Sequence, residues 1–210
     1  MDRKLVEYIE GEILPFYDEH IKCHGSDHVR YVIRRSLDFA EQITDQQINR
    51  DMVYTIAAFH DIGIVVDRAT HEMEGAKMLR SDKTIKQIFT PEQINIMAEA
   101  IEDHRASSNH EPRSIYGRIV SSADRYIGVD AALRSVYKFR IKYSPSATLD
   151  EIIDESITHI FDKFGDGGYA LQKIYFRDTE YEDFCRQLCE LAGDREKFRQ
   201  RLIVANALHM

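Results

Sequence analysis

The chain has 210 residues, of which 43% are hydrophobic and 30% are charged, and its formal net charge at pH 7 is −8. This composition excludes a largely disordered chain and supplies enough apolar residues for a buried core. The negative net charge argues against a main role in binding the nucleic-acid backbone, which requires a basic surface. It does not argue against a local basic pocket for a small phosphate.

Apolar residues recur at the spacing of amphipathic helices along nearly the whole chain. We expect helices over residues 3–20 (despite Pro15), 27–43, 46–61, 91–105, 113–139, 150–164 and 180–207. Thr90 and Pro91 mark the start of one of them, because Pro is favoured in the first turn of a helix. The β-rich run 62–67 directly follows a predicted helix, so we interpret it as a connecting loop. The sequence therefore predicts an all-α fold.

The segment 141–149 is the best internal boundary. We expect residues 1–140 to form one multi-helix domain and residues 141–210 to form a C-terminal helical extension packed on it. An exposed helical extension could also form a homodimer, so the sequence leaves the oligomeric state open.

The three cysteines, Cys23, Cys185 and Cys189, are odd in number and form no CxxC motif, which is typical of reduced thiols in the cytosol. The N-terminus is charged and amphipathic, and no run of about 18 apolar residues occurs. We therefore expect a cytoplasmic protein that binds neither a membrane nor nucleic acid.

Four predicted helices each carry a His or Asp on the apolar face: His28, His60, His104 and Asp124. One His on such a face is more often a hydrogen-bonded core residue than a metal ligand. A buried carboxylate, however, is very costly unless it meets a cation, and its predicted neighbours here are imidazoles. A shared divalent metal ion would satisfy all four groups, so we predict a metal site.

Asp61 directly follows His60, and adjacent residues on a helix point about 100° apart. The two side chains therefore cannot easily share an ion in mid-helix. Gly63 indicates that the helix ends here, so that both side chains can converge. Asp61 could also bridge two metal ions with its two oxygens.

With these residues the chain resembles the HD-domain metal-dependent phosphohydrolase superfamily, and most closely its small stand-alone bacterial members. The matching segments, in family order, are 24–32 (HGSDHVRYV), 57–63 (AAFHDIG), 70–79 (THEMEGAKML), 98–105 (AEAIEDHR) and 119–126 (IVSSADRY). The resemblance implies an all-α HD-domain bundle over residues 1–140. It also implies that His28, His60, Asp61 and Asp124 form the metal shell.

The resemblance further implies that His71, at the start of a helix, contacts a second metal ion or the substrate phosphate. His104 occupies the corresponding late position. Some two-metal relatives have a His-His pair where this chain has Asp103 and His104, so one or two metal ions both stay open. The alternative for His71 is a solvent-exposed residue at a helix N-terminus.

The implied activity is hydrolysis of a small phosphate ester, with a nucleotide among the candidates, by water activated by the metal through Asp61 and its neighbours. Mn²⁺, Fe²⁺, Zn²⁺ and Ni²⁺ suit mixed nitrogen and oxygen ligands, whereas imidazole favours Mg²⁺ less. Arg105 and Arg125 adjoin metal ligands and are candidates to bind the phosphate, although each could equally be a surface charge. Asp103 is a candidate to orient an imidazole or to transfer a proton.

Two other functions stay open. A di-iron oxygenase on the same scaffold would require both His71 and His104 as iron ligands. A catalytically silent, nucleotide-binding regulator is the other alternative, but the intact ligand set argues against it, because an inactive site often loses a ligand. The sequence does not identify the substrate.

Overall fold

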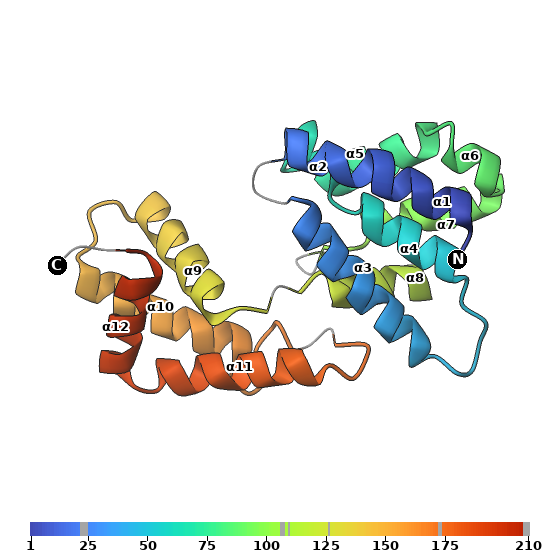
Figure 1. Ribbon diagram of the computed structural model, residues 1–210. Helices are drawn as coiled ribbons and strands as arrows, with labels where there is room; N and C mark the ends of the chain where they lie inside the picture. The colour runs from blue at the N-terminus through green and yellow to red at the C-terminus, as the bar shows by residue number, and fades with distance from the viewer. Residues whose placement is uncertain (22–24, 106–107, 109, 126, 172–173, 208–210) are drawn as a thin grey trace. The chain divides into compact units, whose positions relative to one another are not determined.

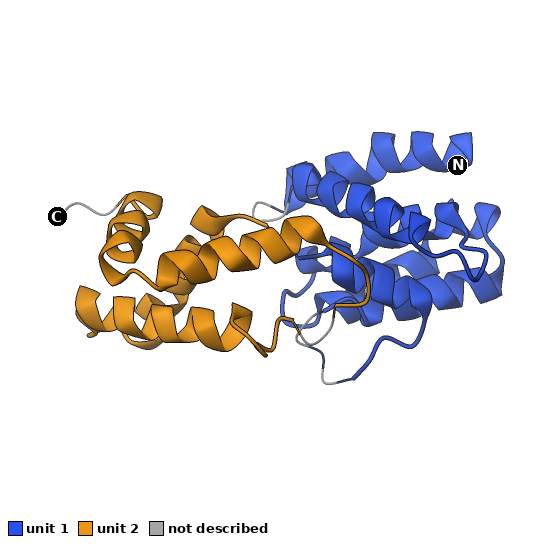
Figure 2. Ribbon diagram, turned by 90° about the horizontal axis from the view of Figure 1, so that it is seen from below, with its two compact units in different colours: residues 1–125 blue, residues 126–210 orange. Residues whose placement is uncertain are grey.

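The computed structural model describes residues 1–21, 25–105, 108, 110–125, 127–171 and 174–207. These residues form helices joined by turns, with no strand among them, which confirms the all-α fold class. The chain divides into two compact units, residues 1–125 and residues 126–210 (Figure 2). No helix within the described ranges is long and apolar enough to cross a membrane.

Unit 1 begins with a helical segment composed of α1 (Arg3–Tyr8), the π-helical turn η1 (Ile9–Ile13) and α2 (Leu14–His20), drawn in blue in Figure 1. Pro15 has no N–H, and in a regular α-helix its ring would collide with the carbonyl four residues earlier. The wide turn lies just before it, with the Leu14 N–H bonded to the Ile9 carbonyl. The helix predicted over 3–20 is therefore present, with its hydrogen bonding rearranged around the proline.

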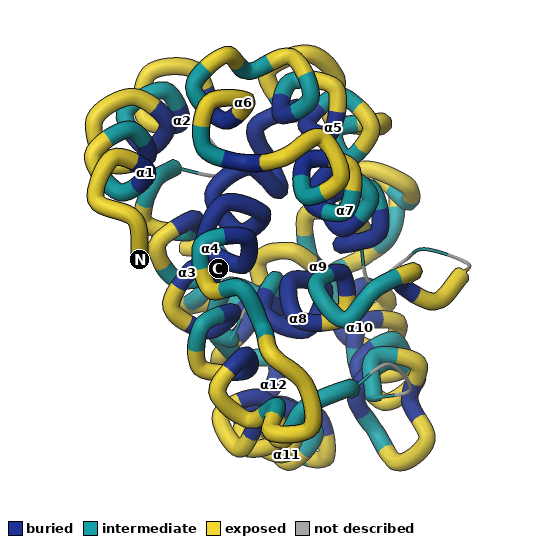
Figure 3. Tube along the Cα trace, turned by 90° about the vertical axis from the view of Figure 1, so that its right-hand side faces the viewer, coloured by how far each residue is buried: buried dark blue, intermediate teal, exposed yellow. Residues whose placement is uncertain are grey.

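The other helices of unit 1 are α3 (Ser26–Glu41), α4 (Arg50–Phe59), the 3₁₀ turn η2 (Ile62–Val65), α5 (His71–Ser81), α6 (Ile85–Ile88), α7 (Pro91–Glu102) and α8 (Ile115–Ala123). The central helix is α4, which is buried from Met52 to Phe59 and is dark blue in Figure 3. It packs against α3, α7 and α8. The predicted start of α7 is confirmed, because Thr90 and Gln93 form a capping box before Pro91.

The segment after α4, predicted as a loop, begins with η2 and packs directly on the backbone of α5. A Cβ on Gly63 would lie 2.1 Å from the carbonyl oxygen of His71 and 2.5 Å from the backbone nitrogen of Gly75. A Cβ on Gly75 would in turn lie 3.1 Å from the Phe59 carbonyl oxygen. These two glycines therefore allow α5 to approach the end of α4.

Unit 2 contains α9 (Val129–Tyr143), α10 (Leu149–Phe164), α11 (Thr179–Ala192) and α12 (Arg195–Ala205). Two long predicted helices are interrupted. The one over 113–139 breaks after Ala123, because Asp124 has ψ 39° and leaves the helical conformation. The one over 180–207 breaks before Arg195, because Asp194 accepts the Lys197 N–H and starts a new helix.

The two compact units divide between residues 125 and 126, whereas the sequence predicts a domain boundary after residue 140. Helix α9 belongs to unit 2, where Leu133 is fully buried in one core with Ile153 and Phe198. The segment chosen from the sequence, 141–149, contains the end of α9, a short turn and the start of α10. Cys23 lies outside the described residues, Cys185 is buried and Cys189 is partly buried.

We expect Gly63→Ala to lower the free energy of unfolding of unit 1 by about 1–3 kcal/mol. The added methyl group would overlap the backbone of α5 at His71 and Gly75, which would have to shift. Chemical denaturation measures this. Gly11→Ala is the matched control, since a Cβ there meets nothing within 4 Å. It should leave the free energy of unfolding unchanged or slightly raised, because Ala favours helix more than Gly does. A Gly63→Ala protein as stable as the wild type would contradict the close packing of η2 on α5.

Candidate metal centre

The structure brings together all six residues named from the sequence as metal ligands. They fall into two groups, His28, His60 and Asp124, and Asp61, His71 and His104, and the ligand atoms within each group lie within 4.8 Å of one another. All six belong to unit 1. The residues come from α3, the end of α4, the start of α5, the segment after α7 and the end of α8.

In the first group, the Nε2 atom of His28 lies close to ligand atoms of both other residues. It lies 3.3 Å from Nε2 of His60 and 3.2 Å from Oδ1 of Asp124. Oδ2 of Asp61 adds a further oxygen, 3.4 Å from Nε2 of His60. This group therefore presents two imidazole nitrogens and two carboxylate oxygens to one point.

In the second group, the Nε2 atoms of His71 and His104 lie 3.2 Å apart. Oδ1 of Asp61 is 3.1 Å from the first of these nitrogens and 3.6 Å from the second. Asp61 thus turns one carboxylate oxygen to each pair of histidines. The sequence raised this bridging role as one option, and the geometry fits it.

Backbone carbonyls fix the orientation of three of the rings. Nδ1 of His60 lies 2.7 Å from the Ala57 carbonyl oxygen, and Nδ1 of His104 lies 2.7 Å from that of Ile101. Nδ1 of His71 lies 2.9 Å from the Arg68 carbonyl oxygen. A carbonyl oxygen only accepts hydrogen bonds, so each Nδ1 carries the proton and each neutral ring presents a lone pair at Nε2.

This arrangement fits bound cations. The facing Nε2 atoms of His71 and His104 are both acceptors when the rings are neutral, and two lone pairs 3.2 Å apart repel unless a proton or a metal ion lies between them. Nitrogen ligands bind transition metals at about 2.1 Å, which places neighbouring ligands about 3.0–3.4 Å apart around one ion. The shortest ligand spacings here, 3.1 to 3.4 Å, fall in that range. The donor set suits a divalent transition metal.

The cluster also perturbs protonation. Burial lowers the pKa of His28 and His104, but the Asp124 and Asp61 carboxylates outweigh it, and the net pKa of both imidazoles is raised above 6.5. Burial raises the pKa of Asp124, but the hydrogen bond with His28 and the charges of the other histidines hold it below its usual value. Without a metal ion, the site therefore favours bound protons, which is the expected behaviour of a cluster that needs positive charge.

The ends of helices allow the ligands to converge. Helix α4 ends at Phe59, and Asp61 has φ −106° and ψ 1°, so its side chain leaves the helical array and lies beside His60. Asp124 follows α8 in the same way. The predicted helix end before Gly63 is confirmed.

Asp103 pairs with Arg113 rather than with the His104 ring. Its buried carboxylate accepts hydrogen bonds from the side chain of Arg113, at 2.8 to 3.1 Å, and from the Arg113 backbone N–H, at 2.7 Å. The acceptor behind the His104 ring is the Ile101 carbonyl instead. Asp103 thus anchors the chain after α7, and no feature of the sequence marked Arg113 as its partner.

Arg105 and Arg125 differ in environment. Nη1 of Arg105 contacts the Ala69 carbonyl oxygen at 3.0 Å and the Glu72 carboxylate at 3.2 and 3.3 Å. Arg125 is 7% exposed, so it is not a surface charge. Its carbonyl oxygen accepts a hydrogen bond from the Tyr31 hydroxyl at 3.2 Å.

His24 and Tyr126, at the ends of two of the matching sequence segments, lie outside the described residues.

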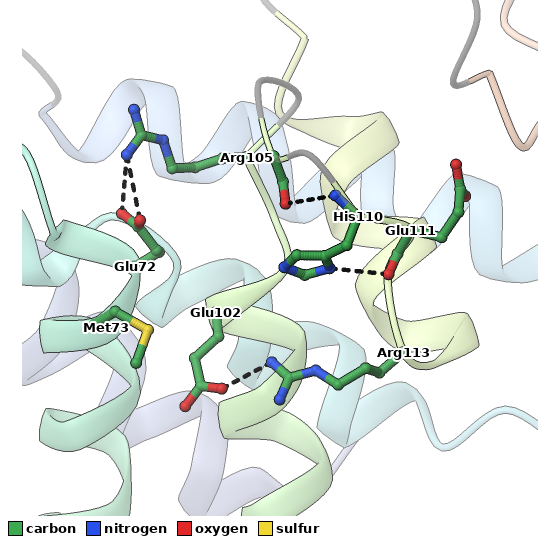
Figure 4. Close-up of a pocket in the computed structure, with 8 residues that line it drawn as sticks. Glu72, Met73, Glu102, Arg105, His110, Glu111 and Arg113 are labelled. Atoms are coloured by element: carbon green, nitrogen blue, oxygen red, sulfur yellow. Dashed lines mark hydrogen bonds and ion pairs between the residues drawn. The ribbon is translucent and has the colours of Figure 1, made fainter.

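A cavity of about 900 Å³ lies beside this region. Its lining is mostly charged and comprises Glu72, Met73, Glu102, Arg105, Ser108, His110, Glu111 and Arg113. Figure 4 shows two arginine–glutamate pairs on its walls, Arg105 with Glu72 and Arg113 with Glu102. Glu72 also lies 3.4 Å from Nδ1 of His71, so one wall of the cavity contacts a residue of the second ligand group.

Comparison with known proteins agrees with this geometry. The chain matches no curated protein and no solved structure at a significant level. Residues 25–128 match the family model of the HD domain, and this range contains all six candidate ligands. Residues 25–128 therefore form an HD domain, the domain that defines the HD-domain superfamily of metal-dependent phosphohydrolases.

Proposed function

We propose that the protein is a metal-dependent hydrolase of a small phosphate ester, with nucleotides as the first substrates to test. The observation that carries this proposal is the division of the Asp61 oxygens between two histidine pairs, His28 with His60 and His71 with His104. Membership of the HD-domain superfamily supports it.

An anionic substrate is attracted more strongly by a centre of two ions than by a centre of one. Four neutral imidazoles and two carboxylates carry a charge of −2 in total, so one divalent ion gives a neutral centre and two give a centre of charge +2. A positive centre attracts a phosphate ester, which is an anion. We therefore propose two ions, drawn from Mn²⁺, Fe²⁺, Zn²⁺ and Ni²⁺, because these accept mixed nitrogen and oxygen ligands.

A divalent ion held here would supply Lewis acidity, which lowers the pKa of water and neutralises charge on a phosphoryl oxygen. The residues of the chain do the rest. Asp61 and Asp124 lie beside the histidines, and their carboxylate oxygens can orient a nearby water by accepting hydrogen bonds from it. The N–H groups of Arg105 that point away from Glu72, together with Arg125, bind the phosphate oxygens in this proposal. Asp103 contributes by holding Arg113 and the chain that follows α7.

We propose that the organic part of the ester occupies the cavity lined by Glu72, Arg105 and Arg113. Its volume of about 900 Å³ is large enough for a nucleotide-sized group. Its paired arginines and glutamates favour a polar group over an apolar one, since they offer both donors and acceptors.

A di-iron oxygenase is the second candidate. It requires both His71 and His104 as iron ligands, and the 3.2 Å separation of their Nε2 atoms is compatible with this. Oxygen consumption by the iron-loaded protein, with no phosphate release from any ester, would favour it over the hydrolase.

We expect His60→Ala and Asp61→Ala to abolish both metal binding and phosphate release. Each substitution removes a ligand, and Asp61→Ala removes the one shared by both groups. The measurement is metal content by mass spectrometry after purification without chelator, together with a phosphate-release screen over nucleotides and sugar phosphates. His20→Ala is the control, because His20 is exposed and pairs with Glu19 outside the cluster. Full activity in either ligand variant would refute the assignment.

We expect added Mn²⁺ to raise the melting temperature more at pH 8 than at pH 6. The folded-state pKa values of His28 and His104 are raised, so their protonation stabilises the metal-free fold below about pH 6.5, and this contribution is lost as the pH rises through the folded values. Metal ions need the unprotonated rings and gain affinity in the same window. Asp124 has a lowered pKa and stays ionised throughout. Thermal unfolding with and without Mn²⁺ tests this, and an increase that does not change with pH would contradict it.

A further inference from the structure

The N-terminal segment α1–η1–α2 precedes the residues that match the HD domain, yet it contacts the end of α4. Tyr17 in α2 is fully buried, and its hydroxyl donates to the Ala58 carbonyl oxygen at 3.0 Å. Ala58 is itself fully buried and lies three residues before Asp61. The segment therefore supplies a hydrogen bond at the place where α4 gives way to the ligands.

This bond replaces one that the helix lacks. In a continuing α-helix the Ala58 carbonyl would accept the backbone N–H of Ile62, but α4 ends at Phe59 and Ile62 begins η2. A buried carbonyl needs another donor, and the Tyr17 hydroxyl supplies it. The Ala57 carbonyl oxygen likewise accepts a hydrogen bond from a side chain, the His60 ring. Two side chains thus allow α4 to end before Asp61 in a buried environment.

The Tyr17 hydroxyl is also close to Asp61 itself. Burial is the main cause that raises the pKa of Tyr17 well above 10, the Asp61 charge raises it further, and the Asp61 backbone N–H acts in the opposite direction. The hydroxyl thus keeps its proton and acts as a donor.

We propose that Tyr17 is a positioning residue for the metal centre. By holding the Ala58 carbonyl, Tyr17 fixes where α4 ends and so directs the two oxygens of Asp61 to their separate histidine pairs. This inference rests on the proposed metal centre and assigns a role to a segment outside the family match.

The next residue, Asp18, makes an analogous contact with α3. Its carboxylate accepts the backbone N–H and the hydroxyl of Ser26, each at 2.8 Å. The N-cap residue of α3, Gly25, has no side chain to cap the helix, and His28 lies in the first turn. Two consecutive residues of α2 therefore hold the elements that carry His28 and Asp61. Asp18 is exposed, so we expect it to contribute less than Tyr17 to positioning the ligands.

The test is Tyr17→Phe, which keeps the buried ring and removes only the hydroxyl. Tyr8→Phe is the matched control. Tyr8 lies in the same N-terminal segment, and its hydroxyl bonds to Asp82 just before α6, away from the ligands. A purely structural role for Tyr17 would lower the melting temperature in both variants and leave metal binding unchanged in both.

The metal-free wild type and both variants are titrated with Co²⁺, with the visible absorption spectrum as the readout of ligand geometry and calorimetry as the readout of affinity. We expect Tyr17→Phe to lose about tenfold in affinity for at least one ion, with an altered spectrum, as for other residues that orient metal ligands. Tyr8→Phe should match the wild type in both readouts.

Wild-type affinity and spectrum in Tyr17→Phe would overturn the inference, whatever its activity. If Tyr17→Phe is too unstable to titrate, the Co²⁺ titration is repeated on all three proteins with an osmolyte such as TMAO, which favours the folded state: weaker binding by Tyr17→Phe supports the role of Tyr17, and wild-type binding overturns it. A wild type that binds Co²⁺ but releases no phosphate from any ester overturns the proposed hydrolase and leaves this inference standing. A wild type that binds no divalent ion overturns both.

Discussion

The burial of two carboxylates among four imidazoles is the constraint on which the rest of unit 1 depends. Asp61 and His60 are almost inaccessible to solvent, and ionised groups removed from water are stable only beside opposite charge. The raised pKa of His28 and His104 shows protons meeting this need in the metal-free protein. Divalent ions meet it better, because each brings two charges and binds several lone pairs at once. The same feature that is costly for folding thus creates a strong site for a cation.

Helix ends make this arrangement possible. A ligand in mid-helix would point along one fixed direction, whereas His60, Asp61, His104 and Asp124 all lie where a helix stops. Each such end exposes carbonyl groups that need donors. The ligand rings themselves supply two of these donors, at Ala57 and Ile101. Arg35, a buried cation on α3, donates to the Ala123 carbonyl oxygen at 3.3 Å just before Asp124. Helix termination and ligand orientation are therefore one structural problem here, solved by the same hydrogen bonds.

The sequence indicated which His and Asp residues gather in unit 1, because helical periodicity places His28, His60, His104 and Asp124 on apolar faces, and that signal is local. The end of α4 was also predictable, since Gly63 follows Asp61 closely. The sequence could not show that Gly63 is pressed against the backbone of His71, because that contact joins two helices. The Asp103–Arg113 and Tyr17–Ala58 bonds span 10 and 41 residues and leave no periodic trace. For a related reason the sequence does not show which unit α9 joins: its amphipathic pattern is the same whichever core it packs against.

Glu72 links the two halves of the proposed active site. Its carboxylate lies 3.4 Å from Nδ1 of His71 and also accepts hydrogen bonds from Arg105. If Arg105 turned toward a substrate phosphate, the Glu72 carboxylate would lose the positive charge that now partly neutralises it. Its own negative charge would remain beside the His71 ring. A more negative neighbour at Nδ1 makes the ring a stronger donor of electrons at Nε2, where the second ion would bind. In the proposed two-ion centre, phosphate binding and the strength of His71 as a ligand would therefore be coupled through the Glu72 carboxylate. This coupling depends on the position of Glu72, which follows His71 directly in the first turn of α5 and also contacts Arg105 after α7.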